Sequence, residues 1–288
     1  GGPDPRRTLD PMPAPAHGIP GADIAVTLST ASVYLASTEV AFSLAARLGY
    51  DGIEVMVWTD PATQDATRLR QLVEEHGVPV HSIHAPTLLL TQRVMGIDPW
   101  GKVDRSIELA QEVGATVVVL HPPFRWQKAY AEHFVDGVAT REHDSGLCVA
   151  VENMFPWTAG RGTVQAYLPH WDPVPQPYDH VTMDLSHTAT ARSDAMAMVH
   201  ALGDRLAHVH LADGSGSTTL KDEHLPPGRG NQPCAEFLEH IAESGYTGAV
   251  ALEVGTRRQD RTGREAVLAE SLAFARDHLA AGLARSTS

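Results

Sequence analysis

The chain has 288 residues, a formal net charge of −13, 43% hydrophobic residues and 20% charged residues. A chain of this length and composition can bury a large core, and the length is typical of an α/β barrel. The acidic balance would repel polyanions unless a local basic groove outweighed it, so nucleic acid is disfavoured as a partner without being excluded. No apolar run in the sequence approaches the length of a membrane span, so no membrane contact is expected.

The two cysteines and the first residues add little to the expected chemistry. Cys148 and Cys234 lie outside any Cys-x-x-Cys context, which argues against a disulfide framework or a thiolate zinc site and fits a reducing cytoplasm. Residues 1–21 are rich in proline and glycine and lack the apolar core of a signal peptide. We expect residues 1–21 to be a flexible tail and residues 22–288 to form one catalytic barrel domain.

Strand-like and helix-like segments alternate from Ala22 to the end of the chain. The expected strands cover residues 22–29, 52–58, 78–85, 116–121, 147–153, 180–185, 207–213 and 249–254. The expected helices cover residues 38–49, 63–76, 100–113, 127–143, 193–202, 233–244 and 264–280, and residues 156–177 are expected to be irregular. Because parallel strands need helical crossovers, this order predicts a (β/α)8 TIM barrel, with a doubly wound open sheet as the alternative.

Metal-ligating side chains end six of the expected strands. The apolar runs VHSIHAP, TVVVLHPP, LCVAVEN, HVTMDLSH, AHVHLAD and AVALEV each stop at a histidine or an acid. Those six residues, with three more in the following loops, are His84, His121, Glu152, Asp184, His187, His210, Asp222, His224 and Glu253. Taken singly, each could be a hydrogen-bonded core residue. Taken together, they predict one polar cup at the carboxyl-terminal rim of the barrel.

The chemistry of this cup points to divalent cations. Carboxylates held this close would repel one another and raise one another's pKa, and cations resolve that conflict. Imidazole and carboxylate ligands without thiolate suit zinc, manganese or iron(II) rather than calcium. We therefore expect one to three divalent metal ions, with zinc as the first choice and manganese or iron as alternatives.

These residues carry a resemblance to a known superfamily. The phrases GYDGIEVM, VHSIHAP, VVVLHPP, VAVEN, MDLSH, HVHLAD, KDEHLPPGRG and LEV resemble the xylose-isomerase-like TIM barrels, from about Ala22 to Ala280. That superfamily joins sugar and sugar-phosphate isomerases and epimerases with endonuclease IV (AP endonuclease family 2). The resemblance to the isomerases implies a single metal held by Glu152, Asp184, His210 and Glu253, proton transfer by the two glutamates, and substrate contact by His187.

The resemblance to endonuclease IV implies a three-zinc cluster that uses all nine positions. The chain departs from both branches. No acid occurs in the residues 153–158 after Glu152, where epimerases typically carry a second glutamate, and Gly214-Ser215-Gly216 stands where they often place an arginine. Ala85-Pro86-Thr87-Leu88 lacks the aromatic residue that endonuclease IV inserts into DNA. The sequence leaves the choice between the branches open.

Substrate contacts are expected on the same rim. Cationic candidates for a phosphate are Arg125, Arg229 and Arg257, although each could equally be a solvated surface arginine. Trp58, Trp126 and Trp157 follow strands and could stack on a sugar face or pack the loops. Glu54 is a candidate partner for a ligand histidine, with a structural salt bridge as the alternative.

The sequence thus favours a cytoplasmic, metal-dependent isomerase or epimerase acting on a small sugar or sugar phosphate. A phosphoester hydrolase of the endonuclease IV type is the first alternative, because the full ligand set is present. Iron-dependent oxidation in the same cup and a barrel that only holds metal are further alternatives. Neither the substrate nor the oligomeric state follows from the sequence.

Overall fold

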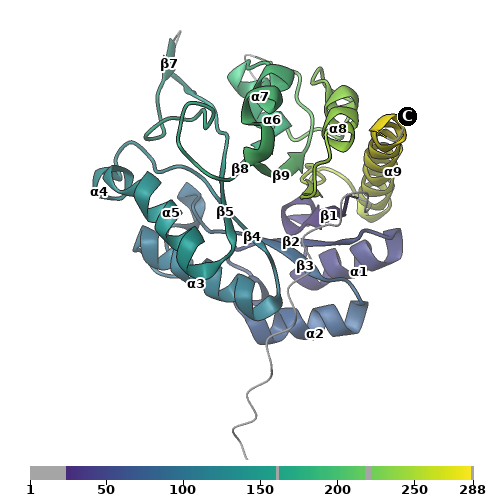
Figure 1. Cartoon of the computed structure of the whole chain (residues 1–288). Coiled ribbons are helices and arrows are strands. Elements are labelled where there is room, and N and C mark those ends of the chain that lie inside the picture. Colours follow the sequence, from purple (N-terminus) through teal and green to yellow (C-terminus); the bar gives the residue numbers. More distant parts are fainter. Residues whose placement is uncertain (1–23, 160–161, 218–221, 287–288) are drawn as a thin grey trace, which may run out of the picture.

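The computed structural model describes residues 24–159, 162–217 and 222–286, and eight parallel strands within them close into a barrel (Figure 1). The barrel order is β1-β10-β9-β8-β5-β4-β3-β2. The strands are β1 (Val26–Ser29), β2 (Gly52–Met56), β3 (Val80–His84), β4 (Val117–Leu120), β5 (Cys148–Glu152), β8 (Val181–Asp184), β9 (Leu206–Leu211) and β10 (Ala249–Leu252). The expected (β/α)8 barrel is confirmed. The tail predicted at residues 1–21 lies outside the described residues.

Helices surround the barrel and bury its outer face. The α-helices are α1 (Thr38–Leu48), α2 (Ala66–His76), α3 (Pro99–Val113), α4 (Lys128–Glu132), α5 (Phe134–Ser145), α6 (Leu185–Ala191), α7 (Ala195–Leu202), α8 (Cys234–Glu243) and α9 (Arg261–Ser286). Short 3-10 helices are η1 (Thr30–Val33), η2 (Pro61–Gln64), η3 (Leu89–Thr91) and η4 (Gly203–Arg205). The apolar core lies between strands and helices and includes Phe42, Leu69 and Phe237. None of the described helices has the length and hydropathy needed to cross a bilayer.

Three local features differ from the sequence expectations. The stretch expected to be irregular contains an antiparallel hairpin, β6 (Trp157–Ala159) with β7 (Gly162–Val164). The helix expected over residues 127–143 divides at His133, whose φ of −112° and ψ of 13° are not helical. Helix α6 was not expected, and it starts directly at the end of β8 because the Asp184 carboxylate accepts a hydrogen bond from the His187 amide.

The strand register stacks polar side chains inside the barrel. Glu54 pairs with Ser82 across β2 and β3, and Thr182 pairs with His208 across β8 and β9. All four side chains are fully buried. Since side chains on a strand alternate between the two faces, the residues two positions later point to the same interior one layer nearer the rim. His84, Asp184 and His210 occupy those positions.

Asp213 organises the loop between β9 and α8, which carries two of the predicted ligands. Its buried carboxylate accepts backbone hydrogen bonds from Gly214 (2.8 Å), Gly228 (2.9 Å), Gly230 (2.9 Å) and Gln232 (3.0 Å). A Cβ on Gly230 would lie 2.2 Å from Asp213 Oδ1, so glycine is required at this close approach. One buried carboxylate therefore determines how this loop folds back onto the rim.

We predict that Asp213→Asn lowers the free energy of unfolding by about 2–3 kcal/mol, because an amide presents one acceptor oxygen and an NH₂ group to amides that need acceptors. Urea unfolding followed by circular dichroism measures the change. Asp194→Asn is the matched control, since Asp194 is an exposed helix cap with one bond to the Ala197 amide and asparagine caps equally well. Equal stability of the two variants would contradict the role of Asp213.

Candidate metal centre

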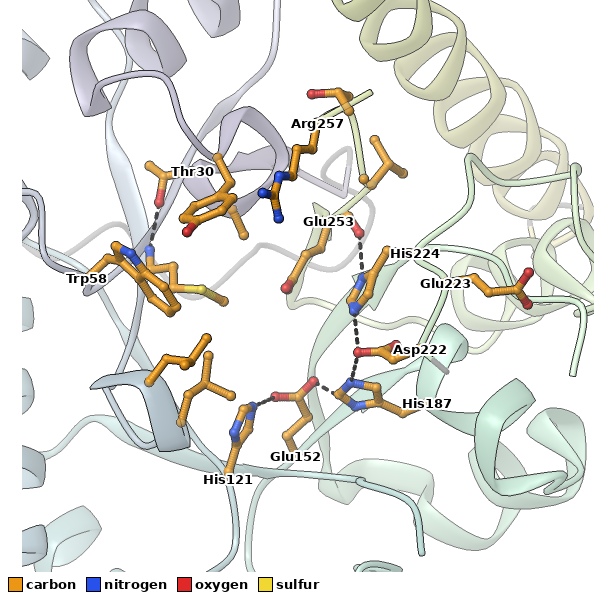
Figure 2. Close-up of a pocket in the computed structure, with 18 of the residues that line it drawn as sticks. Thr30, Trp58, His121, Glu152, His187, Asp222, Glu223, His224, Glu253 and Arg257 are labelled. Atoms are coloured by element: carbon orange, nitrogen blue, oxygen red, sulfur yellow. Dashed lines mark hydrogen bonds and ion pairs between the residues drawn. The ribbon is translucent and has the colours of Figure 1, made fainter. Parts of the chain in front are cut away.

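The structure brings the predicted ligands together at the carboxyl-terminal end of the barrel. Strand ends supply His84, Glu152, Asp184 and His210, while His121 and Glu253 follow β4 and β10. His187 lies in the first turn of α6. Asp222 and His224 come from the loop that Asp213 holds. Figure 2 shows a continuous series of contacts from His121 through Glu152, His187 and Asp222 to His224.

Glu152 lies among four imidazoles. Its Oε2 is 2.9 Å from His121 Nε2 and 3.2 Å from His84 Nε2. Its Oε1 is 3.0 Å from His210 Nδ1 and 3.2 Å from His187 Nδ1. Burial opposes ionisation of this carboxyl group, but His210, His121 and His187 together hold its pKa well below the usual value. The centre of the site is therefore an ionised, buried carboxylate.

His210 connects the remaining carboxylates to this centre. Its Nδ1 is 3.2 Å from Glu253 Oε2 and 3.7 Å from Asp184 Oδ2, in addition to its contact with Glu152. Burial alone would lower the pKa of His210, but Glu54, Glu152 and Glu253 raise it well above its usual value. Burial raises the pKa of Glu253, and the nearby His210 and His224 oppose that rise. The acids of β5, β8 and β10 thus meet at one imidazole nitrogen.

A second carboxylate lies one layer deeper and supports His210 from below. Glu54 Oε1 is 3.0 Å from His210 Nε2, and Glu54 Oε2 accepts hydrogen bonds from His208 Nε2 (2.7 Å) and Ser82 Oγ (2.8 Å). Glu54 and His208 are fully buried. Burial opposes ionisation of Glu54, but the two histidines hold its pKa well below the usual value. With Nε2 directed at Glu54, His210 presents Nδ1 to the cup.

The loop ligands form an ion pair at the edge of the cup. Asp222 Oδ2 is 2.8 Å from His224 Nε2 and 3.3 Å from His187 Nε2. His224 is only partly buried, and although desolvation lowers the pKa of an imidazole, Asp222 raises the pKa of His224 to about 10. Ser186 Oγ donates to Asp222 Oδ1 at 2.9 Å and accepts from the His224 amide at 3.0 Å. These bonds join the loop to α6.

The donor atoms fit divalent cations. Within the part of the chain that the structure describes, four sets of three ligand atoms lie within 4.8 Å of one another: Glu54/His208/His210, His84/Glu152/His210, Asp184/His187/His224 and Asp184/His210/Glu253. Among the described residues, Asp184 Oδ2, Glu253 Oε2 and His121 Nδ1 are buried without a hydrogen-bond partner. Buried oxygens of this kind normally have a partner, and a cation supplies one. The cup can therefore hold a metal, with room in its ligand set for more than one ion.

A cavity of about 690 Å³ opens above the ligands. Its floor includes His121, Glu152, His187, Asp222, His224 and Glu253. Across from them lie Trp58 and Arg257 (Figure 2). Tyr34 joins these two side chains, because its ring packs edge-on against Trp58 at 5.5 Å and the Arg257 guanidinium lies 5.8 Å from its centre. The size suits a small polar molecule.

The structure brings only some of the predicted substrate residues to this cavity. Trp58 and Arg257 line it. Trp126 and Trp157 pack together with Phe124 and line no part of it, and Trp126 borders a neighbouring cavity instead. Arg125 is exposed and lines neither of these cavities. Arg229 forms an ion pair with Glu270 at 2.5 Å and is also absent from both walls, so neither arginine is placed to clamp a phosphate in this conformation.

Sequence reasoning missed several residues that position the ligands. Asn153 joins the ends of β5 and β8, since it donates to the Asp184 carbonyl at 3.0 Å and accepts from the Asp184 amide at 2.6 Å. Its carbonyl also accepts from His187 Nδ1 at 2.8 Å. Ser186 and Asp213 were missed as well. The position of Asn153 beside Glu152 was an available signal, whereas the loop bonds of Asp213 reach amides up to 19 residues later and follow no fixed local spacing.

Comparison with known proteins places this geometry in a family. The family described as xylose isomerase-like TIM barrel matches residues 42–278. An uncharacterized protein of Mycobacterium tuberculosis is 49% identical over 276 residues, covering 89% of this chain and 98% of that protein. Fructoselysine 3-epimerase of Shigella flexneri is 24% identical over 241 residues, covering 76% of this chain and 85% of the relative.

The fold is also shared with solved structures. D-psicose 3-epimerase of Clostridium cellulolyticum, determined with D-tagatose, superposes with a TM-score of 0.66 at 15% identity, covering 89% of this chain and 99% of the other. At that identity the likeness concerns the fold alone. The match over residues 42–278 and the closed parallel barrel lead to one conclusion: the chain belongs to the xylose isomerase-like TIM-barrel family.

Proposed function

We propose that the protein is a divalent-metal-dependent epimerase or isomerase of a small sugar or sugar phosphate. The observation that carries this proposal is the placement of two carboxylates, Glu152 and Glu253, on the floor of one cavity. Both lie against the same nitrogen, His210 Nδ1, at 3.0 Å and 3.2 Å. Two acids that line one cavity can each exchange a proton with a substrate bound there.

In the proposed reaction, one glutamate takes a proton from a carbon beside a carbonyl, and the other returns a proton to the neighbouring face or carbon. The metal would be held by Glu152, Asp184, His210 and Glu253, and when bound it polarises oxygen atoms of the substrate. His187, held by Asn153 and Asp222, contacts the substrate from the cavity floor. Trp58 supplies an apolar wall and Arg257 a cation for a polar or phosphorylated end.

A phosphoester hydrolase is the second candidate, and the outer ligands favour it. His84, His121, Asp222 and His224 lie around the four inner ligands, and a set such as Asp184/His187/His224 could hold a further cation. Two or three ions could generate and orient a hydroxide for attack on a phosphoester. Cleavage of an abasic-site duplex at physiological salt, lost in Glu253→Ala, would support this function over epimerisation.

We propose that the protein acts in the reducing cytoplasm and that its binding partner is a small sugar. Both cysteines are free, and Cys234 is buried. Zinc is the first choice of metal, with manganese and iron(II) next, because the ligand set contains only imidazole and carboxylate donors. Named relatives and fold neighbours include epimerases of D-psicose and fructoselysine, so ketoses and their derivatives are the first substrates to test.

We predict that Glu152→Gln and Glu253→Gln each lower kcat by about 10²–10⁴, because each removes a proton-transfer group. The assay incubates D-psicose, D-tagatose and fructoselysine, and their phosphorylated forms, in D₂O. Deuterium uptake at the epimerised carbon is measured by NMR. Glu270→Gln is the control, since Glu270 lies outside the cavity and pairs with Arg229. Turnover that survives both cavity substitutions would show the proton-transfer proposal to be wrong.

We predict that the purified protein holds about one tightly bound divalent ion per chain. Elemental analysis after dialysis gives the count, and thermal denaturation checks the site, because a ligand present at about 1,000 times its Kd stabilises the fold by about 4 kcal/mol. Asp184→Asn should abolish the rise in Tm on addition of zinc or manganese. Two or three tightly held ions would instead favour the hydrolase.

We predict that Glu54→Gln weakens metal binding about 10–100-fold although Glu54 belongs to the deeper layer, because it orients His210 from below. Competition with a chromophoric chelator measures the affinity. Ser82→Ala, which removes one hydrogen bond to Glu54 and leaves its contact with His210, should change the affinity much less. The same loss in both variants would indicate general loosening of the barrel interior.

A further inference from the structure

A second, smaller cavity lies beside the main one. It measures about 290 Å³, and its walls come from the segments that follow β3 and β4 and from the first turn of α3. Leu88 and His121 line both cavities. Because His121 Nε2 is 2.9 Å from Glu152 Oε2, this side cavity borders the reaction centre directly.

The side cavity is basic, whereas the main cavity is acidic. Lys102 and Arg93 line the side cavity, and no aspartate or glutamate does. The main cavity is lined by five acids: Asp60, Glu152, Asp222, Glu223 and Glu253. In a chain with 35 acidic and 22 basic residues, a cavity with cations alone is a selective environment for anions.

Lys102 is a buried cation without a carboxylate partner. Its side chain belongs to α3, and the residue is 6% exposed. Its Nζ donates to the Thr91 carbonyl at 2.8 Å and to the Pro86 carbonyl at 3.4 Å. Among the described residues no acid forms an ion pair with Lys102 or with Arg93, which is exposed at the cavity rim. Carbonyl oxygens offset only part of the cost of burying an ammonium group, and an anion would offset the rest.

Tyr130 adds an aromatic ring to this wall. The ring is held edge-on against Trp100 at 4.7 Å and against Phe134 at 5.3 Å. This packing makes Tyr130 a rigid part of the wall.

Apolar surface surrounds these polar groups. The rings of Phe124 and Trp126 stack in parallel at 4.7 Å, and both residues line the side cavity. Trp126 is 50% exposed and Ile97, another lining residue, is 82% exposed. These side chains give the side cavity an apolar wall beside its cations, as is usual in small-molecule pockets.

We propose that the side cavity is a subsite for an anionic group, a carboxylate or phosphate, carried on a planar or apolar arm of the substrate. The anion contacts Lys102 and Arg93, and the arm packs against Phe124 and Trp126. This assignment rests on the proposed function in taking the reacting sugar to lie in the main cavity. It narrows the substrate class to sugars with an acidic, extended substituent, such as an aromatic glycoside acid or a phosphorylated conjugate.

Calorimetric titration of the metal-free protein tests the subsite without requiring turnover. The probes are phenyl phosphate, benzoate, inorganic phosphate and the neutral benzyl alcohol. We expect the two aromatic anions to bind at least about tenfold more tightly than benzyl alcohol and than inorganic phosphate, because only they use both the cations and the apolar wall. Phenyl phosphate against benzoate distinguishes a phosphate from a carboxylate as the preferred anion.

Two variants and a control locate the binding. Lys102→Met keeps the length of the side chain and should weaken binding of the aromatic anions at least about tenfold, while Arg93→Gln should weaken it about threefold or more. Arg229→Gln, at an exposed arginine paired with Glu270 outside both cavities, should leave binding unchanged. Thermal denaturation shows whether each variant folds. If Lys102→Met does not fold, the rim variant Arg93→Gln decides the question.

Benzyl alcohol that binds as tightly as the aromatic anions, or anion affinities unchanged in Arg93→Gln, would overturn the subsite. Inorganic phosphate that binds as tightly as phenyl phosphate would overturn the role of the apolar arm. These outcomes are separate from the fate of the proposed function, because the titrations use no metal and no reaction. If the protein binds the aromatic anions as expected but shows no epimerase activity, the proposed function is rejected and the subsite is retained.

Discussion

The site depends on carboxylates buried among imidazoles inside a closed barrel. Glu152 has four histidine nitrogens within 3.2 Å, and Glu54 beneath it has two within 3.0 Å. Acids so deeply buried would be protonated without cationic or donor neighbours, and the histidines would be neutral without the acids. The charged form of each group is therefore stable only because oppositely charged groups lie beside it. A bound cation would stabilise the carboxylates in the same way.

The barrel makes this arrangement possible because side chains along each strand alternate, with a period of two residues, between the barrel interior and the surrounding helices. Glu54, Ser82, Thr182 and His208 form one polar layer, and His84, Asp184 and His210 lie one step nearer the rim. A shift of one residue in any strand would turn its ligand toward the helices. The tight β8–α6 junction adds His187 to the cup, because Asp184 both ends the strand and caps the helix. Asp213 brings in the ligands of the β9–α8 loop.

The barrel and its rim were predictable because strand ends in a parallel sheet share one edge. Apolar runs that stop at His121, Glu152 or Asp184 already indicate that edge, whatever the loops do. The pairing of β6 with β7 was not foreseen, since proline-rich sequence gives little local signal for pairing. The place of Lys102 in the wall of a cavity could not be predicted from the sequence. In the sequence it is one charged residue in an amphipathic helix, and only the fold of the segment around Thr91 buries it.

The two cavities differ in the groups that balance their buried charges. Acids of the main cavity gather around histidines and leave oxygens free for a metal, whereas Lys102 meets only carbonyl oxygens. A substrate that carries its own anion would balance the second set of charges, as a bound metal would balance the first. His121, which lines both cavities, would then lie between the reacting sugar and its acidic substituent. On that arrangement, substrate selection and proton transfer use neighbouring but electrostatically opposite surfaces that share His121, so a change in one set of charges is expected to affect the other.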